Sequence, residues 1–350
     1  MRLAVLGAGA VGPGAAALAV SRGHEAAIWS PRGGGTHGIG SSLRVQGVLS
    51  GTARVAVAVD VARALEGAAA VLVSVPPHAL GPLLRRIAPM LADGVPVLLA
   101  PSHSLAPLLL DRLLARRGLR VPVAALAVPP VAAERLTGDE VRILALPEAV
   151  EIATVPAASA ESIARLCSDL FGMAFIHLSD ALGAALAAHE PVLQSALVLG
   201  NVSRIEAGED WDQHRQMTPA ICRLAERLDA ERLALAAAYG HAVPSLAAGL
   251  HRMSGVPVAP LPVMARTLAA ARPAPGLRGL DATLLAQSVT YGLALWLRLA
   301  AARGVPMPLT GAAMAVLEAM WGSSLSADDL LEGLDFSQLR TLLQDGHPRA

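Results

Sequence analysis

The sequence has no lysine, because all 28 of its basic side chains are arginine. Every mechanism that needs a lysine as acid, base or Schiff-base nucleophile is therefore excluded. Cysteine is almost as scarce: Cys167 and Cys222 are the only two, they lie far apart, and they match no metal-binding or CxxC pattern. This scarcity predicts a reduced, cytoplasmic chain that holds no metal.

Charge is sparse as well, since only 16% of the residues are charged and the formal net charge is zero. No run of five like charges occurs, which argues against a nucleic-acid partner or a polybasic contact with a membrane. The apolar start at 1–7 turns glycine-rich too early for a signal peptide. The apolar stretch at 294–302 is broken by Arg298 and bounded by Arg303, so it predicts a buried helix.

What the chain has in abundance is apolar sequence, at 54% of 350 residues, enough for two domains with separate cores. Buried-strand patterns at 2–7, 25–30, 71–75, 95–101 and 121–130 alternate with helical segments, which predicts a parallel sheet with helices on both faces. Strand signals mostly stop after about residue 157, and helical patterns follow. The sequence therefore predicts an α/β Rossmann domain over 1–170 and an all-α domain over 171–350.

The first strand runs into "VLGAGAVG", in which Gly7, Gly9 and Gly12 have GxGxxG spacing. Because the motif follows a strand and opens a helix, it predicts a dinucleotide site with the pyrophosphate at the helix N-terminus. The alternative is a purely structural glycine turn. The residues expected at the cofactor are Gly7, Gly9, Ala10, Val11 and Gly12 in this turn, and Val75, Pro76 and His78 after the strand at 71–75.

The second strand ends in "IWSPR" without the acidic residue that usually holds the ribose hydroxyls of NAD. Ser30 and Arg32 stand there instead, and no carboxylate follows before Asp60. A hydroxyl and a guanidinium suit a 2′-phosphate, so the sequence favours NADPH, with NADH as the second choice. The alternative is that Arg32 is merely a solvated loop residue.

Three segments of the second half point to a known family: "TPAICRLAERLDAERLALAAAYG", "YGLALWLRLAAARGVPMP" and the order of proline, leucines, glycine and asparagine within 191–201. With them, the chain resembles the octopine/nopaline (opine) dehydrogenase family. The resemblance implies a Rossmann domain and a helical domain, with substrates in the cleft between them. It also implies reductive condensation of an α-keto acid with an amine or amino acid by a nicotinamide cofactor. Arg135 is then expected to clamp a carboxylate, and Asn201 to bind substrate; the alternative for Arg135 is an ion pair with Glu134 or Asp139.

The stretch "AHEPVLQSALVLGN" departs from this family. Gln194 stands where the family resemblance implies a histidine, Glu190 stands at an asparagine position, and Ser195 at a proline position. Farther on, Gln287 and Ser288 stand where the family often has an acidic pair. Both members of the expected His–Asp pair are therefore replaced.

Reduction of a ketone needs a hydride and also a proton for the developing alkoxide. The amide of Gln194 can only donate a hydrogen bond to a carbonyl. An iminium carries its proton already, so the sequence predicts a reductase of a C=N bond, with a small amine- or amino-acid-derived substrate. The residues expected at the reaction are Gln194, Ser288, His189 and Tyr291, and further candidates for a missing acid are His78, His103 and His241.

Two other interpretations stay open. The same scaffold could bind a dinucleotide without turning it over, as a non-redox cyclase or a ligand-binding protein, which the loss of both family residues favours. A ketopantoate reductase is disfavoured, because such enzymes resemble the first domain but depend on a lysine. The apolar helical half also makes a homodimer plausible.

Overall fold

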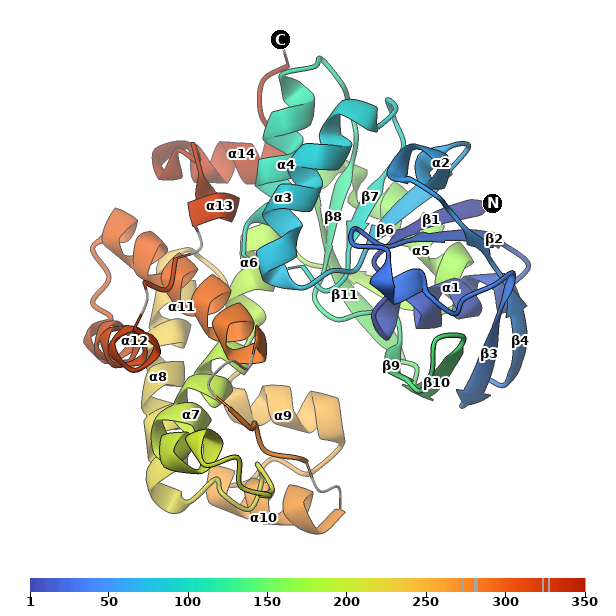
Figure 1. Cartoon of the computed structure of the whole chain (residues 1–350). Helices are drawn as coiled ribbons and strands as arrows, with labels where there is room; N and C mark the ends of the chain where they lie inside the picture. The colour runs from blue at the N-terminus through green and yellow to red at the C-terminus, as the bar shows by residue number, and fades with distance from the viewer. Residues whose placement is uncertain (103, 272–273, 280–282, 323, 327, 350) are drawn as a thin grey trace. The chain divides into compact units, whose positions relative to one another are not determined.

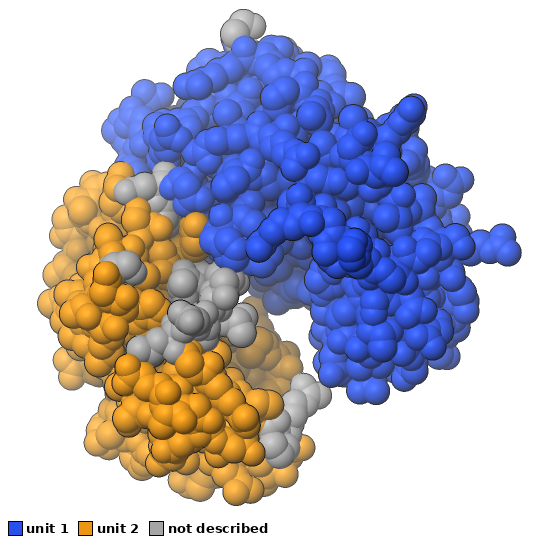
Figure 2. Space-filling model, viewed as in Figure 1, with its two compact units in different colours: residues 1–185, 329–350 blue, residues 186–328 orange. Residues whose placement is uncertain are grey.

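The computed structural model describes residues 1–350 except 103, 272–273, 280–282, 323, 327 and 350, and it leaves the side chains of 283–288 and 328 undescribed. The chain forms two compact units, 1–185 with 329–350 and 186–328, which Figure 2 shows in blue and orange. The sequence placed the boundary near residue 170 and gave all of 171–350 to the second domain. In the structure the C-terminal segment 329–350 instead belongs with the first unit.

The first unit contains an eight-stranded sheet, and its strands are parallel except for one antiparallel pair, β8 with β11. The inner strands are runs of Val, Leu and Ala that are buried on both faces, which is typical of parallel sheets covered by helices. The predicted α/β fold is therefore confirmed (Figure 1). The order across the sheet is β12 (Ala174–His177), β11 (Ala149–Val155), β8 (Val123–Leu126), β7 (Val97–Leu99), β6 (Ala70–Val73), β1 (Arg2–Leu6), β2 (Glu25–Trp29) and β5 (Ala56–Val57).

Counted along the chain within this sheet, β5, β2, β1, β6, β7 and β8 are the third, second, first, fourth, fifth and sixth strands. This is the strand order of dinucleotide-binding sheets, in which the ligand lies beyond the carboxyl ends where the order reverses. The reversal here lies between β1 and β6. The helices of this unit are α1 (Val11–Ser21), α2 (Val61–Leu65), α3 (Pro77–Ile87), α4 (Ala106–Ala115), α5 (Ala160–Phe171), most of the short α6 (Ala181–Ala187) and α13 (Asp328–Leu331), and the C-terminal α14 (Leu339–Asp345).

A second, four-stranded sheet was not predicted from the sequence. Its order is β4 (Gly51–Arg54), β3 (Ser42–Gly47), β10 (Glu140–Ala145) and β9 (Ala132–Arg135). Helix α1 packs against this sheet as well as against β1 and β2. The close approach depends on small residues, because a Cβ on Gly14 would lie 3.0 Å from the side chains of Val131 and Ala133.

The C-terminal segment is tied to the first unit by polar contacts. Arg85 of α3 donates a hydrogen bond to the carbonyl of Asp329 (2.7 Å) and forms an ion pair with Glu332 (2.6 Å). The backbone N–H of His347 donates to the fully buried carboxylate of Asp111 in α4 (2.5 Å). These contacts explain why the end of the chain belongs with the nucleotide-binding fold and not with the helices that precede it.

The second unit is helical, as predicted. Helix α7 packs against both α8 and α11, and α8 also contacts α12. Thr218 caps α8 by accepting from the N–H of Ile221 (3.4 Å), and Pro219 follows at the first helical position, as the sequence indicated. The helices are α7 (Glu190–Glu206), α8 (Pro219–Ala238), α9 (Leu246–Ser254), α10 (Leu261–Ala271), α11 (Thr283–Arg303) and α12 (Pro308–Trp321).

Candidate functional site

The turn between β1 and α1 is compatible only with glycine at two of its positions. Gly7 has a φ of +130°, and a Cβ built there would lie far closer than 3.0 Å to the carbonyl oxygen of Ser74, which follows β6. A Cβ on Gly12 would meet the carbonyl oxygen of Gly7 in the same way. These contacts bring the ends of β1 and β6 and the start of α1 together at the point where the strand order reverses.

Gly9 differs from these two glycines because its Cβ position is open, with no heavy atom within 4 Å. Gly9 is exposed, and Ala10 and Val11 are half-buried beside it. No side chain caps the first turn of α1. Its backbone N–H groups can therefore receive an anion, as they do in pyrophosphate sites at helix N-termini.

The segment after β6 lies at the same place. The N–H of Ser74 donates to the carbonyl of Leu6 (2.9 Å), so the chain leaves β6 beside the glycine turn. Val75 is buried there, while Pro76 and His78 are exposed, the latter in the first turn of α3. These three residues are predicted at the cofactor, and of them Val75 lies against the turn, since a Cβ on Gly7 would be 3.2 Å from its side chain.

Arg135, at the end of β9, is bound to the glycine turn itself. Its NH1 group donates to the carbonyls of Ala8 (2.8 Å) and Gly9 (3.3 Å). The other guanidinium N–H groups donate to the carbonyls of Gly35 (3.2 Å), Thr137 (2.8 Å) and Gly138. All five donors of the guanidinium thus meet carbonyl oxygens of three separate chain segments.

This arrangement gives Arg135 a positioning role that the sequence did not predict. Neither alternative ion pair forms with it, because Glu134 pairs with Arg142 (3.4 Å) and Asp139 with Arg44 (2.9 Å). A substrate carboxylate would have to displace the backbone carbonyls before Arg135 could clamp it. Burial lowers the pKa of Arg135, but an arginine remains charged at any ordinary pH.

A cavity of about 400 Å³ lies at the carboxyl end of β2, where the adenosine half of a dinucleotide binds in this fold. Ser30, which the sequence predicts at the cofactor, lines it, whereas Arg32, which is predicted there too, is exposed on the loop and does not line it. The sequence missed three charged or titratable members of this lining, since Arg86, His37 and Asp60 come from different segments. The lining residues are Trp29, Ser30, Pro31, Gly33, Thr36, His37, Val57, Ala58, Val59, Asp60 and Arg86.

In the helical unit, Gln194 and Glu190 lie one turn apart on α7, and the amide of Gln194 lowers the pKa of the Glu190 carboxyl. Glu190 is exposed at the first position of α7, although many protein atoms surround its carboxyl. Desolvation by these atoms raises the pKa of Glu190 above its ordinary value, and the amide of Gln194 opposes the shift only in part. Glu190, which the sequence did not single out as an acid, is therefore a protonatable group one turn from Gln194.

His189 lies in a different environment from this pair. It precedes α7, and its ring packs so closely on Gly249 of α9 that a Cβ on that glycine would overlap Nδ1. Burial lowers the pKa of His189 to about 4, and the charge of Arg232 acts in the same direction. At neutral pH His189 is consequently an uncharged imidazole and not a reservoir of protons.

The other predicted residues are distributed as follows. Asn201 is buried at a kink of α7, with φ −134° and ψ 19°, and its amide donates to the carbonyl of Leu197 (2.9 Å). Tyr291 is also buried, at 8% exposure, in α11. The side chain of Ser288 and the whole of His103 lie outside the described residues. His241 is half-buried after the end of α8.

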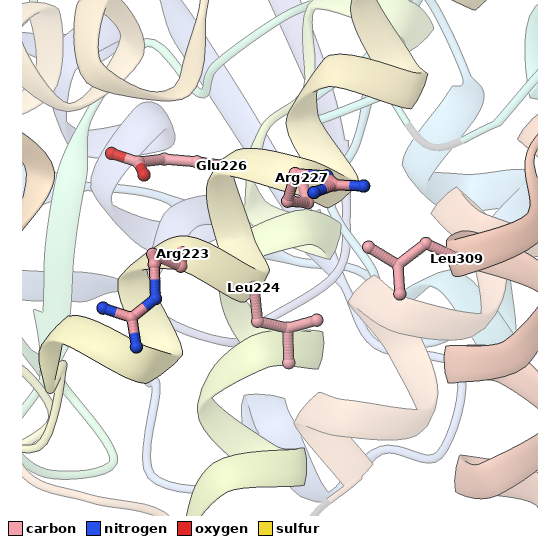
Figure 3. A pocket seen from close by; sticks show the side chains of 5 residues that line it. All are labelled: Arg223, Leu224, Glu226, Arg227 and Leu309. Atoms are coloured by element: carbon pink, nitrogen blue, oxygen red, sulfur yellow. The ribbon is translucent and has the colours of Figure 1, made fainter.

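The helical unit also has a surface pocket of about 520 Å³, shown in Figure 3. Arg223, Leu224, Glu226 and Arg227 of α8 line it together with Leu309 of α12. It contains none of the residues predicted to take part in the reaction. Among the described residues, no three His, Cys, Asp or Glu side chains are grouped so that they could hold a metal ion.

Comparison with known proteins agrees with this division into a nucleotide-binding part and a helical part. Residues 177–321 match the alpha-helical domain of NAD/NADP octopine/nopaline dehydrogenases, and residues 2–101 match the N-terminus of NAD-dependent glycerol-3-phosphate dehydrogenase. An opine dehydrogenase of Arthrobacter sp. (strain 1C) is 24% identical over 263 residues, which cover 75% of this chain and 73% of that protein.

Solved structures show the same fold. Octopine dehydrogenase in complex with NADH and L-arginine has a TM-score of 0.79 at 14% identity, over 98% of both chains. Yersinopine dehydrogenase with NADP⁺ bound has a TM-score of 0.71 at 16% identity, over 98% of this chain and 97% of that one. With its glycine turn, its strand order and its helical domain, the chain is similar to the NAD(P)-dependent opine dehydrogenases, in sequence over residues 177–321 and in fold over nearly its whole length.

Proposed function

We propose that the protein uses NADPH, or less effectively NADH, to reduce the C=N bond of an imine derived from a small amine or amino acid. One observation carries this proposal: Gln194 stands where the resemblance implies a histidine, and the carboxyl of Glu190, one turn away on α7, has a raised pKa. The glycine turn supports the nucleotide part, because the Cβ position of Gly9 is open toward solvent. The absence of a carboxylate directly after β2 supports the preference for NADPH.

The chemistry of the Glu190–Gln194 pair suits an imine better than a ketone. When bound, the cofactor supplies a hydride. The protonated carboxyl of Glu190 gives its proton to the nitrogen of a neutral imine, the hydride adds to the carbon of the resulting iminium, and the carboxylate regains a proton from water. Gln194, one turn away on α7, offers an amide hydrogen to the substrate. A neutral imine nitrogen is basic enough to take a proton from a carboxyl before hydride transfer, whereas a ketone oxygen is not.

A comparison of substrates tests this function. The purified protein is expected to oxidise NADPH with a preformed cyclic imine, and to do so much more slowly with pyruvate plus L-arginine, because the latter pair must first condense. The readout is the near-ultraviolet absorbance of the reduced cofactor. Turnover of the keto acid and amino acid pair alone, with no turnover of any cyclic imine, would reject the proposal.

The role of Glu190 has a separate test in the pH profile. Because its pKa is raised, the protonated form persists to higher pH than for an ordinary glutamic acid, and the wild-type rate is expected to fall as pH rises through that pKa. Glu190→Gln keeps a hydrogen-bonding group but has no proton to give, so it should lower the rate and remove this decline. Glu206→Gln, at the exposed far end of the same helix, is the matched control. A profile that is unchanged in Glu190→Gln would show that this carboxyl handles no proton.

A non-redox protein on the same scaffold is the second candidate, because Gln194 and Ser288 stand where the resemblance implies the family's His–Asp pair. Such a protein would bind NADPH and never oxidise it. Tight binding in calorimetry, together with constant cofactor absorbance over a panel of linear and cyclic imines, would favour this alternative over a reductase.

A further inference from the structure

The cavity at the carboxyl end of β2 holds a guanidinium that no sequence motif indicated. We propose that Arg86 of α3, and not Arg32, recognises the adenosine half of the cofactor: it covers the adenine with its guanidinium plane and supplies the positive charge for a ribose 2′-phosphate. This inference rests on the proposed function only in so far as a dinucleotide binds in the first unit.

The position of Arg86 is fixed by an aromatic side chain. Its guanidinium carbon lies 4.9 Å from the centre of the Trp29 ring, and Trp29 is the last residue of β2, with only 5% of its surface exposed. A cation stacked on a buried indole loses little freedom when a ligand arrives. Arg86 itself is exposed and lines the cavity, so the guanidinium face opposite Trp29 is available to a second flat group. An adenine ring is a group of that shape.

Two nearby arginines, Arg85 and Arg32, do not line this cavity. Arg85, the adjacent residue of α3, is committed to the C-terminal segment through its bonds to Asp329 and Glu332. Arg32 is exposed on the loop after β2 and does not line the cavity. Of the arginines described in this unit, Arg86 is the one that the cavity lining includes. It is therefore the side chain placed to pair with a phosphate through two parallel N–H donors.

The same cavity contains an opposing charge, the carboxylate of Asp60. One of its oxygens accepts from the N–H of Arg63 (2.8 Å) and so caps α2, which keeps the carboxylate in place at the end of β5. A carboxylate near the ribose accepts hydroxyl groups and repels a 2′-phosphate. The cavity thus combines a residue that favours NADH with one that favours NADPH. We expect the balance between Asp60 and Arg86 to set the cofactor preference.

Calorimetry with two fragments separates these contributions without depending on turnover. The probes are adenosine 2′,5′-bisphosphate and 5′-ADP, which differ in the 2′-phosphate. The wild type should bind the bisphosphate roughly ten- to hundredfold more tightly, as expected for charge-assisted hydrogen bonds. Arg86→Ala should lose most of this ratio. It should also weaken the binding of both probes, because the guanidinium that stacks on the adenine is removed. Arg86→Lys should retain part of the ratio, and Asp60→Asn should increase it.

The control is Arg165→Ala, an exposed arginine of α5 in the same unit, which should bind both probes as the wild type does. Thermal unfolding of each variant checks that the fold is retained. Wild-type ratios in Arg86→Ala would overturn the inference, and so would loss of the ratio in Arg32→Ala in place of Arg86→Ala. If the wild-type protein binds neither fragment and neither NADPH nor NADH, the proposed function fails with it. If the wild type binds the probes and Arg86→Ala keeps the wild-type ratio of affinities, this inference is refuted but the proposed function is not.

Discussion

Replacement of Gly9 by valine is expected to abolish nucleotide binding and to leave the first unit folded. The Cβ position of Gly9 is free of protein atoms within 4 Å, so the protein itself can accommodate a side chain there. A bound pyrophosphate needs that space, because the backbone at this position must approach the phosphates closely. Affinity for NADPH should fall by at least about a hundredfold, or about 2.7 kcal/mol, in isothermal calorimetry.

Two matched variants make this result specific. Gly40→Val, at another exposed glycine with an open Cβ position, should bind NADPH as the wild type does. Gly7→Ala should instead destabilise the fold, because the new methyl group overlaps the carbonyl of Ser74 and the φ of +130° is strained for any other residue. Wild-type affinity in Gly9→Val would mean that the glycine turn is not the nucleotide site.

Replacement of Asp229 by alanine is expected to have the largest effect on stability, about 3–5 kcal/mol, which is typical when one partner of a buried ion pair is removed. Asp229 accepts two hydrogen bonds from Arg232, at 2.6 and 2.9 Å, and one from the N–H of Leu246 (2.7 Å). The side chain of Arg232 is fully buried and also donates to the carbonyls of Leu186 and Pro244. Without Asp229 it is a buried, uncompensated charge.

Denaturant unfolding measures this cost, with Glu226→Ala as the control, because Glu226 is an exposed carboxylate of the same helix. Combining Asp229→Ala with Arg232→Met should recover much of the loss, because the double variant buries no charge. A loss below about 1 kcal/mol in Asp229→Ala would show that Arg232 finds water or another partner, in conflict with the burial seen here.

The first sheet could be predicted from the sequence because its signals are local. Each inner strand is a short run of Val, Leu and Ala between glycine- or proline-rich turns, and each is found within a few residues of its predicted place. The second sheet could not be predicted in this way. Its central pair joins β3 to β10 through a register that places Arg44 beside Glu140, far apart in the sequence, and no local pattern encodes such a partner.

The candidate site likewise has a part that a local sequence pattern predicts and a part that only the fold brings together. The glycine turn is a contiguous motif, so the sequence located it. Arg86, Asp60 and Arg135 reach the nucleotide region from α3, the end of β5 and β9, and only the fold brings them there. The proton-handling candidates differ for another reason: His189 and Glu190 are adjacent in the sequence, but packing against Gly249 makes one a neutral base while desolvation makes the other a weaker acid.

The central claim is that a nicotinamide bound to the first unit gives its hydride to the carbon of a C=N bond. It is tested most directly with NADPH that carries deuterium on the transferred position of the ring, incubated with a cyclic imine. Mass spectrometry of the amine product should find one deuterium per molecule at the former imine carbon. A product without the label, or no product despite saturating NADPH, would contradict the account.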